Sequence, residues 1–93
     1  MERTLDIIGN RWTSLIVREL LMGTKRFSEL RRNLQGISPK TLSERLAALE
    51  DEGILTRTLY PEVPPRVEYR LTEKGRSLAP IFEAMREWGS QWT

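Results

Sequence analysis

The stretch GISPKTL, residues 36–42, decides the fold of this 93-residue sequence. Ser38 has the side chain of a helix N-cap, and Pro39 follows at the first helical position, where its missing N–H costs nothing. Ile37 stands before the cap and Leu42 stands four residues after it, the spacing at which two apolar side chains pack across a helix start. The stretch therefore predicts a break in the chain followed by a firmly started helix.

The helix that starts there is expected to cover residues 38–52 and to end at Gly53. At 100° per residue, Leu42, Leu46 and Leu49 form one narrow stripe that faces a core. The opposite side then carries short or donor-bearing side chains near the helix start, as a helix that lies in the major groove of DNA requires. An ordinary amphipathic surface helix also shows leucines at this spacing, so this helix alone leaves both interpretations open.

The segments before this helix are also mostly helical. Apolar side chains spaced three and four residues apart predict helices over residues 3–8 and 11–21, the second ended by Gly23. Residues 25–27 are expected to form a short extended link, and Ser28 is expected to cap a short helix that ends near Leu34. A short helix, a tight turn and a capped helix together make a helix-turn-helix.

Two strands and a last helix follow. Residues 54–60 and 66–71 are rich in Leu, Thr, Val and Tyr and alternate at period two, and PEVPP joins them, so they predict a β-hairpin with a stiff tip. Thr72 is expected to cap a final helix to about residue 92, and Pro80 inside it is expected to bend the helix or to loosen its hydrogen bonding locally. This order predicts an α+β, mainly helical winged helix-turn-helix with a two-stranded wing, as a single domain over the whole chain. Other α+β domains share parts of this order.

Composition excludes several classes of function. The sequence has no cysteine and no histidine, which removes thiolate sites, thiol switches, the commonest metal ligand and the commonest general base near neutral pH. The carboxylates show no pattern of a buried acid–base pair, so we expect no catalytic residues, no metal, no cofactor and no enzymatic activity. No signal peptide is visible, and no apolar run approaches the ~20 residues of a bilayer span, so a cytoplasmic protein without membrane contact is expected.

Positive charge is concentrated in the middle of the chain. The formal net charge is only +2, yet residues 25–45 carry six basic side chains against two acidic ones, a local balance of +4. This indicates a face that binds a polyanion, although an ordinary solvated surface can have the same composition. Lys25 and Arg26 are expected to hold phosphates. Arg31 and Arg32 either do the same or pair locally with Glu29.

Arg66 follows the prolines at the tip of the hairpin. A pre-organised loop with one arginine suits insertion near a minor groove or along the phosphates, and the alternative is a surface ion pair with Glu62 or Glu68. A competing hypothesis for the whole chain is a winged helix used for protein contact, because Glu44 suits phosphate binding poorly, although it can accept from a cytosine amino group. The expected DNA-contacting residues are Lys25, Arg26, Ser38, Pro39, Lys40, Thr41, Ser43, Glu44, Arg45 and Arg66.

The last helix carries more bulky apolar residues than a core of this size covers. We expect the first and last helices to pair with a second copy, in a two-fold homodimer that sets two recognition helices about one DNA turn (~34 Å) apart on a palindromic operator. The alternative is that the tryptophans close the core of the monomer. An aromatic pocket between Trp12, Trp88 and the wing would suit a small apolar effector, which the sequence does not specify. The expected dimer residues are Leu5, Ile8, Phe82, Met85, Trp88 and Trp92.

Several segments resemble the HxlR-type winged-helix transcriptional regulators. They are LDIIGNRW (5–12), RFSELRR (26–32), GISPKTL (36–42), YPEVPPRVEY (60–69), LTEKGRSL (71–78) and EWG (87–89), and they extend over nearly the whole chain. The resemblance implies a dimeric bacterial or archaeal transcription regulator that binds double-stranded DNA and has no separate ligand-binding domain. Some members respond to electrophiles or oxidants through a cysteine ahead of the first helix, a residue that this sequence lacks.

Overall fold

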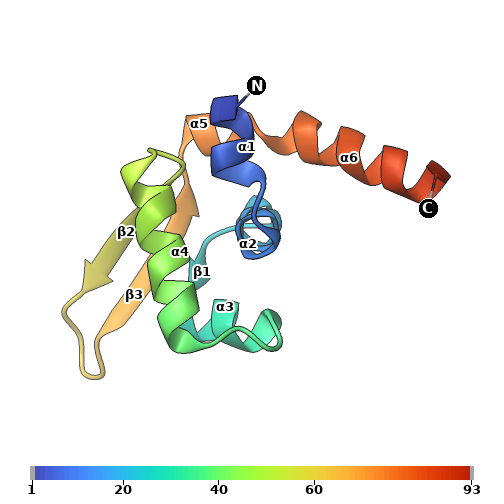
Figure 1. Cartoon of the computed structure of the whole chain (residues 1–93). Coiled ribbons are helices and arrows are strands. Elements are labelled where there is room, and N and C mark those ends of the chain that lie inside the picture. The colour runs from blue at the N-terminus through green and yellow to red at the C-terminus, as the bar shows by residue number, and fades with distance from the viewer. Residues whose placement is uncertain (1, 93) are drawn as a thin grey trace.

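The computed structural model describes residues 2–92, apart from the side chains of Glu2, Ile7 and Ile8. Helices and strands follow one another as the sequence predicts for a winged helix (Figure 1). In chain order the elements are α1 (Glu2–Ile8), α2 (Arg11–Leu21), β1 (Lys25–Arg26), α3 (Phe27–Asn33), α4 (Pro39–Asp51), β2 (Leu55–Tyr60), β3 (Arg66–Leu71), α5 (Glu73–Arg76) and α6 (Ala79–Trp92).

The sheet has three antiparallel strands in the order β1-β3-β2. The predicted hairpin forms with Tyr60 opposite Arg66. The segment expected to be only an extended link contributes a third strand, because Lys25 pairs with Tyr69 and Arg26 with Glu68 along the free edge of β3. Two residues are too few to show an alternating pattern, so this pairing could not be predicted from the sequence.

The core lies where α2, α3 and α4 meet the inner face of the sheet. Leu42, Leu46 and Leu49 of α4 are all buried, which confirms the leucine stripe. Ile37 is buried in the same cluster, as expected for a side chain that packs across the start of α4. The remaining buried apolar residues are Ile16, Val17, Leu20, Leu30, Leu34, Ile54, Leu55, Tyr69 and Leu71.

The helix starts of α2 and α4 are capped by side chains. Asn10 Oδ1 accepts from the N–H of Trp12 at 2.9 Å and from that of Thr13 at 3.3 Å. Ser38 Oγ accepts from the N–H of Thr41 at 3.1 Å, which confirms the predicted cap. The turn before α4 contains Gly36 at φ 90°, a conformation that side chains with a Cβ rarely adopt.

The start of α3 was predicted two residues too late. The helix begins at Phe27 with Arg26 as its N-cap residue, and not after Ser28. The backbone N–H of Arg26 donates to Glu29 Oε1 at 2.8 Å, so a carboxylate that reaches back replaces the hydroxyl cap. This earlier start fits the partly buried Phe27, which packs against the core directly after β1.

The final helix was predicted as one bent helix, and the structure divides it into α5 and α6. Thr72 caps α5, since its Oγ1 accepts from the N–H of Gly75 at 3.1 Å. Pro80 is the second residue of α6 and therefore lies in its first turn, where a missing N–H breaks no helical bond. The proline thus helps to start a helix and does not bend one.

The helix α6 leaves the body of the molecule and extends away from the wing (Figure 1). It gives the molecule an elongated outline of 48 × 25 × 21 Å. Only its first turns touch the core, through the partly buried Leu78 just before the helix and Phe82 within it. The rest of α6 has no partner element within residues 2–92 that would bury its apolar side chains.

Candidate nucleic-acid interface

The helix α4 is held by one face and exposed on the other. Its leucines have at most 3% of their surface exposed, so packing fixes both its position and its rotation. Lys40, Ser43 and Glu44 are exposed, as are Ser38 and Pro39 at the start. Thr41 and Arg45 are half-buried, and the Arg45 Nε has no hydrogen-bond partner within residues 2–92. The predicted contact residues of α4 therefore share one accessible surface at its N-terminal half.

A partly buried hydrogen bond joins α2 and α3 behind this surface. Asn33 at the end of α3 donates from Nδ2 to Glu19 Oε1 of α2 at 2.9 Å, and Glu19 is only 8% exposed. The turn that follows packs against Trp12, whose Cη2 lies 4.0 Å from where a Cβ on Gly36 would stand. These contacts orient the α3–α4 turn and thereby determine how α4 is presented.

Basic side chains surround the start of α3. Arg26, Arg31 and Arg32 are exposed and Lys25 is half-buried. None of the four forms a side-chain ion pair with another of the described residues. The local pairing that the sequence left open for α3 does not form, because the carboxylate of Glu29 caps the helix instead. These cations are available to an external anion.

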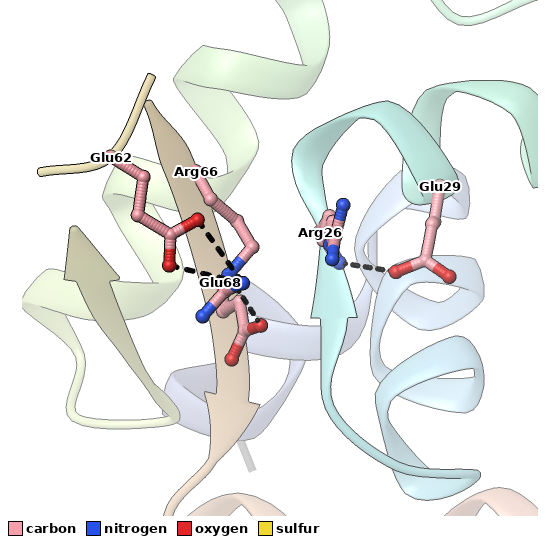
Figure 2. Close-up of polar contacts among 5 residues, drawn as sticks. All are labelled: Arg26, Glu29, Glu62, Arg66 and Glu68. Carbon is pink, nitrogen blue, oxygen red and sulfur yellow. Dashed lines mark hydrogen bonds and ion pairs between the residues drawn. The ribbon is translucent and has the colours of Figure 1, made fainter. Parts of the chain in front are cut away.

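Arg66 forms surface ion pairs, which the sequence left open as the alternative to contact with DNA. Its guanidinium lies 3.3 Å from Glu62 Oε1 and 3.0 Å from Glu68 Oε2, so it is paired inside the wing and is not a free cation at its tip (Figure 2). It also lies over the ring of Tyr60, 4.2 Å from the centroid. Strand register explains this cluster, since Tyr60 is opposite Arg66 and Glu68 follows two residues later on the same face.

Arg57 was not among the contact residues expected from the sequence. Arg57 is exposed and lines a groove between α4 and the wing, together with Ser43 and Ala47 of α4 and Val67 of β3. The alternation of β2 indicated the position of Arg57, because side chains two residues apart in a strand point to the same face and Leu55 is buried. Arg57 therefore lies on the side of the sheet that carries α4.

The expected dimer residues lie on α1 and α6, at the other end of the molecule from the start of α4 (Figure 1). Leu5 of α1 is 54% exposed, and Trp88 and Trp92 of α6 are 63% and 67% exposed. The tryptophans therefore do not close the core of the monomer. Phe82 differs from its expected role in part, because it packs against the core. Met85 is exposed, and the side chain of Ile8 lies outside the described residues.

The aromatic pocket expected between Trp12, Trp88 and the wing is not formed in the monomer. Trp12 packs against the core beside the turn at Gly36, while Trp88 lies on α6, which extends away from the wing (Figure 1). The described residues contain no group of acidic side chains arranged to hold a metal ion. None of the described helices combines the length and the apolar composition needed to cross a bilayer.

A family model described as HxlR-like helix-turn-helix matches residues 7–93. This chain belongs to the HxlR-like helix-turn-helix family. It is 47% identical over 91 residues to YvaP of Bacillus subtilis (strain 168), an uncharacterized HTH-type transcriptional regulator, with 98% of this chain and 84% of YvaP covered. These matches identify a transcriptional regulator with a winged helix-turn-helix and confirm the resemblance seen in the sequence.

Solved structures of similar regulators agree with the fold. The redox regulator HypR in its oxidized form matches with a TM-score of 0.90 at 44% identity, over 99% of this chain and 95% of HypR. The reduced form of the transcriptional regulator YodB from B. subtilis matches with a TM-score of 0.89 at 42% identity, over 99% of this chain and 90% of YodB. The 93 residues of the present HxlR-like chain contain no cysteine, so they offer no thiol for redox chemistry.

Proposed function

We propose that this HxlR-like regulator binds double-stranded DNA sequence-specifically, as a homodimer on a palindromic operator, with α4 in the major groove. The observation that carries the proposal is the division of α4 into a fully buried leucine face and an exposed N-terminal face. Base-edge contacts need a helix whose register cannot shift while its outer side chains reach into the groove. This division meets both requirements.

The contact residues divide into two groups. Lys40, Ser43 and Glu44 stand on the exposed face of α4, where they reach base edges and the adjoining phosphates, and Glu44 suits a cytosine amino group. Lys25 and Arg26 precede α3 and act on phosphates, which position the protein without reading sequence. The half-buried Thr41 and Arg45 and the capping residues Ser38 and Pro39 complete the set.

The homodimer forms through α1 and α6. These two helices carry exposed apolar side chains. They lie at the upper end of the molecule in Figure 1, and the N-terminus of α4 lies at the lower end. A two-fold axis through the terminal helices therefore leaves both copies of α4 free to face one duplex. Contacts through two recognition helices about 34 Å apart require a site with matching half-site spacing and two-fold symmetry.

The test begins with selection of duplexes from a random library by the full 93-residue chain. We expect a palindromic consensus, and we expect Lys40→Ala to weaken binding and to reduce the slope of log affinity against log salt by about 0.9 for each lost phosphate contact. Lys74→Ala is the control for loss of one positive charge, because it removes that charge from α5 at the opposite end of the molecule. Lys74 Nζ also donates to the carbonyl of Glu52 at the end of α4 at 2.6 Å, so thermal unfolding of this variant verifies its fold.

Three results would contradict the proposal. They are the absence of any selected consensus, equal effects of the Lys40 and Lys74 variants, and binding that does not change between low and moderate salt. The first of these, combined with a folded dimeric protein, would favour a winged helix used for protein contact.

A further inference from the structure

One flank of α4 faces the wing and the cations near α3. Ser43 and Ala47 of this flank line a groove together with Arg57 of β2 and Phe27 of α3, and β1 directly precedes Phe27. The major groove of B-DNA is about 12 Å wide and an α-helix with its side chains is about 10–12 Å thick, so a helix inserted there has a phosphate backbone along each flank. The cations on the wing side of α4 reach only one of these two backbones.

The opposite flank of α4 faces α1 and the start of α2. Arg45 and Glu52 are seven residues apart and therefore share this flank, and the carboxylate of Glu52 lies 2.9 Å from the guanidinium of Arg3 in α1. The chain then runs back beside α4, because α1 leads into α2, whose Trp12 packs against the turn at Gly36 just before α4. Accordingly, α1 and α2 lie on one side of α4 and the wing lies on the other (Figure 1).

Arg11 is the first residue of α2 and lies beside the turn that precedes α4. Its guanidinium lies over the ring of Trp12, 5.2 Å from the centroid, and the Cη2 atom of that ring is 4.0 Å from where a Cβ on Gly36 would stand. Arg11 is exposed and forms no side-chain ion pair with another of the described residues. A guanidinium that stacks on an aromatic ring keeps its N–H groups available for an anion. The site is this side chain and not the helix terminus, since Asn10 already accepts from the first free N–H groups of α2.

Arg45 adds a second cation to the same flank. It is half-buried, and its Nε is enclosed without a hydrogen-bond partner among residues 2–92. No carboxylate within those residues forms an ion pair with it. A partly enclosed charge that the chain itself does not neutralise favours an external anion at this flank.

We propose that Arg11, together with Arg45, binds the phosphate backbone along the flank of α4 that faces away from the wing. This inference rests on the proposed DNA binding and adds a contact with the second DNA strand. The cations near α3 then bind one strand and Arg11 and Arg45 bind the other, so α4 is held in the major groove from both sides. Phosphate contacts on both strands fix the orientation of a helix in the groove and thereby the base edges that it reaches.

The salt dependence of binding tests the contact of Arg11. On the duplex selected by the unaltered protein, Arg11→Gln is expected to weaken binding about tenfold per subunit. It should also reduce the slope of log affinity against log salt by about 0.9 per subunit, because one phosphate contact no longer releases a counterion. Arg11→Lys keeps the charge, so we expect it to keep the slope.

Arg18→Gln is the matched control for the loss of one arginine from α2. Arg18 is also exposed and forms no ion pair with another described residue, but it lies two turns further along the helix, at a groove between α2 and α6. We expect it to leave the affinity and the slope unchanged. Sedimentation equilibrium verifies that both variants are dimeric, and thermal unfolding verifies that both are folded.

Ethylation interference locates the contact on the duplex, because ethylation removes the charge of a single phosphate. The unaltered protein is expected to show interfering phosphates on both strands of each half-site. Arg11→Gln should abolish the interference on one strand, and Arg26→Gln should abolish it on the other.

Three outcomes would overturn the inference. They are an unchanged salt slope in the Arg11→Gln variant, equal effects of the Arg11 and Arg18 variants, and loss of the same phosphates in the Arg11 and Arg26 variants. Each is observed on a duplex that the unaltered protein has selected. They are therefore distinct from a failure of the proposed function, in which no duplex is selected and the inference fails with it.

Discussion

Replacement of Trp88 by alanine is expected to dissociate the homodimer. A tryptophan side chain buries up to about 250 Å², and the 63% of Trp88 that is exposed leaves about 150 Å² to be covered by a partner. At about 25 cal/mol per Å² this area is worth about 4 kcal/mol in each subunit. Part of this energy offsets the loss of translational and side-chain freedom on association, so we expect the dissociation constant to rise about 100-fold.

Sedimentation equilibrium over a range of protein concentrations measures this change directly. Leu59→Ala is the matched control, because Leu59 is also a half-exposed apolar residue, at 53%, but lies on the wing. We expect the Leu59 variant to dimerise like the unaltered chain. A monomeric unaltered protein at tens of micromolar, or equal effects of the two variants, would refute the argument that the exposed face of α6 is an interface.

Two further predictions concern the stability of the fold. Asn33→Ala removes the only side-chain hydrogen bond of the buried Glu19 within residues 2–92. We expect the free energy of unfolding to fall by about 1–3 kcal/mol, which thermal unfolding would show as a decrease in Tm of at least about 4 °C. An unchanged Tm would show that this contact does not stabilise the packing of α2 against α3. Gly75→Ala places a Cβ at 2.1 Å from the carbonyl oxygen of Ile54 and should destabilise strongly, whereas Gly89→Ala meets nothing within 4 Å and should gain up to about 1 kcal/mol from helix propensity. Equal urea midpoints for the two glycine variants would contradict the close packing of α5 on the strand start.

The elements that sequence alone predicted well have strong local signals. Ser38 and Pro39 determine the start of α4, and residues 11–21 form α2 with the predicted bounds because an apolar stripe lies between the Asn10 cap and Gly23. These signals depend on neighbouring residues only. The same holds for the hairpin, whose strands alternate at period two on either side of a proline-rich tip.

The features that were missed depend on contacts between distant residues. The strand β1 exists because the edge of β3 is free to pair with Lys25 and Arg26, more than forty positions earlier in the chain. The ion pairs of Arg66 depend on strand register, which determines that Glu68 shares its face. Glu29 was available as a capping carboxylate, but only the exit of the chain from β1 decides that α3 starts at Phe27.

The sequence predicted which residues of the candidate site lie on an accessible surface, but it predicted less well what each of these residues does. The sequence indicated the exposed face of α4 and the cations near α3, and the structure places these residues at accessible positions. The alternation of β2 placed Arg57 on the same strand face as Leu55, but its position in the groove beside α4 also depends on which face of the sheet carries the helix. Surface position follows from periodicity, whereas the role of a charged side chain follows from its three-dimensional neighbours.

Methylation interference at guanine N7 on the selected duplex tests the central claim most directly, because N7 is accessible only in the major groove. Insertion of both copies of α4 predicts two clusters of interfering guanines, related by two-fold symmetry and separated by about ten base pairs. A single cluster, or binding that no guanine methylation disturbs in a consensus that contains guanines, would show that α4 does not enter the major groove as a symmetric pair.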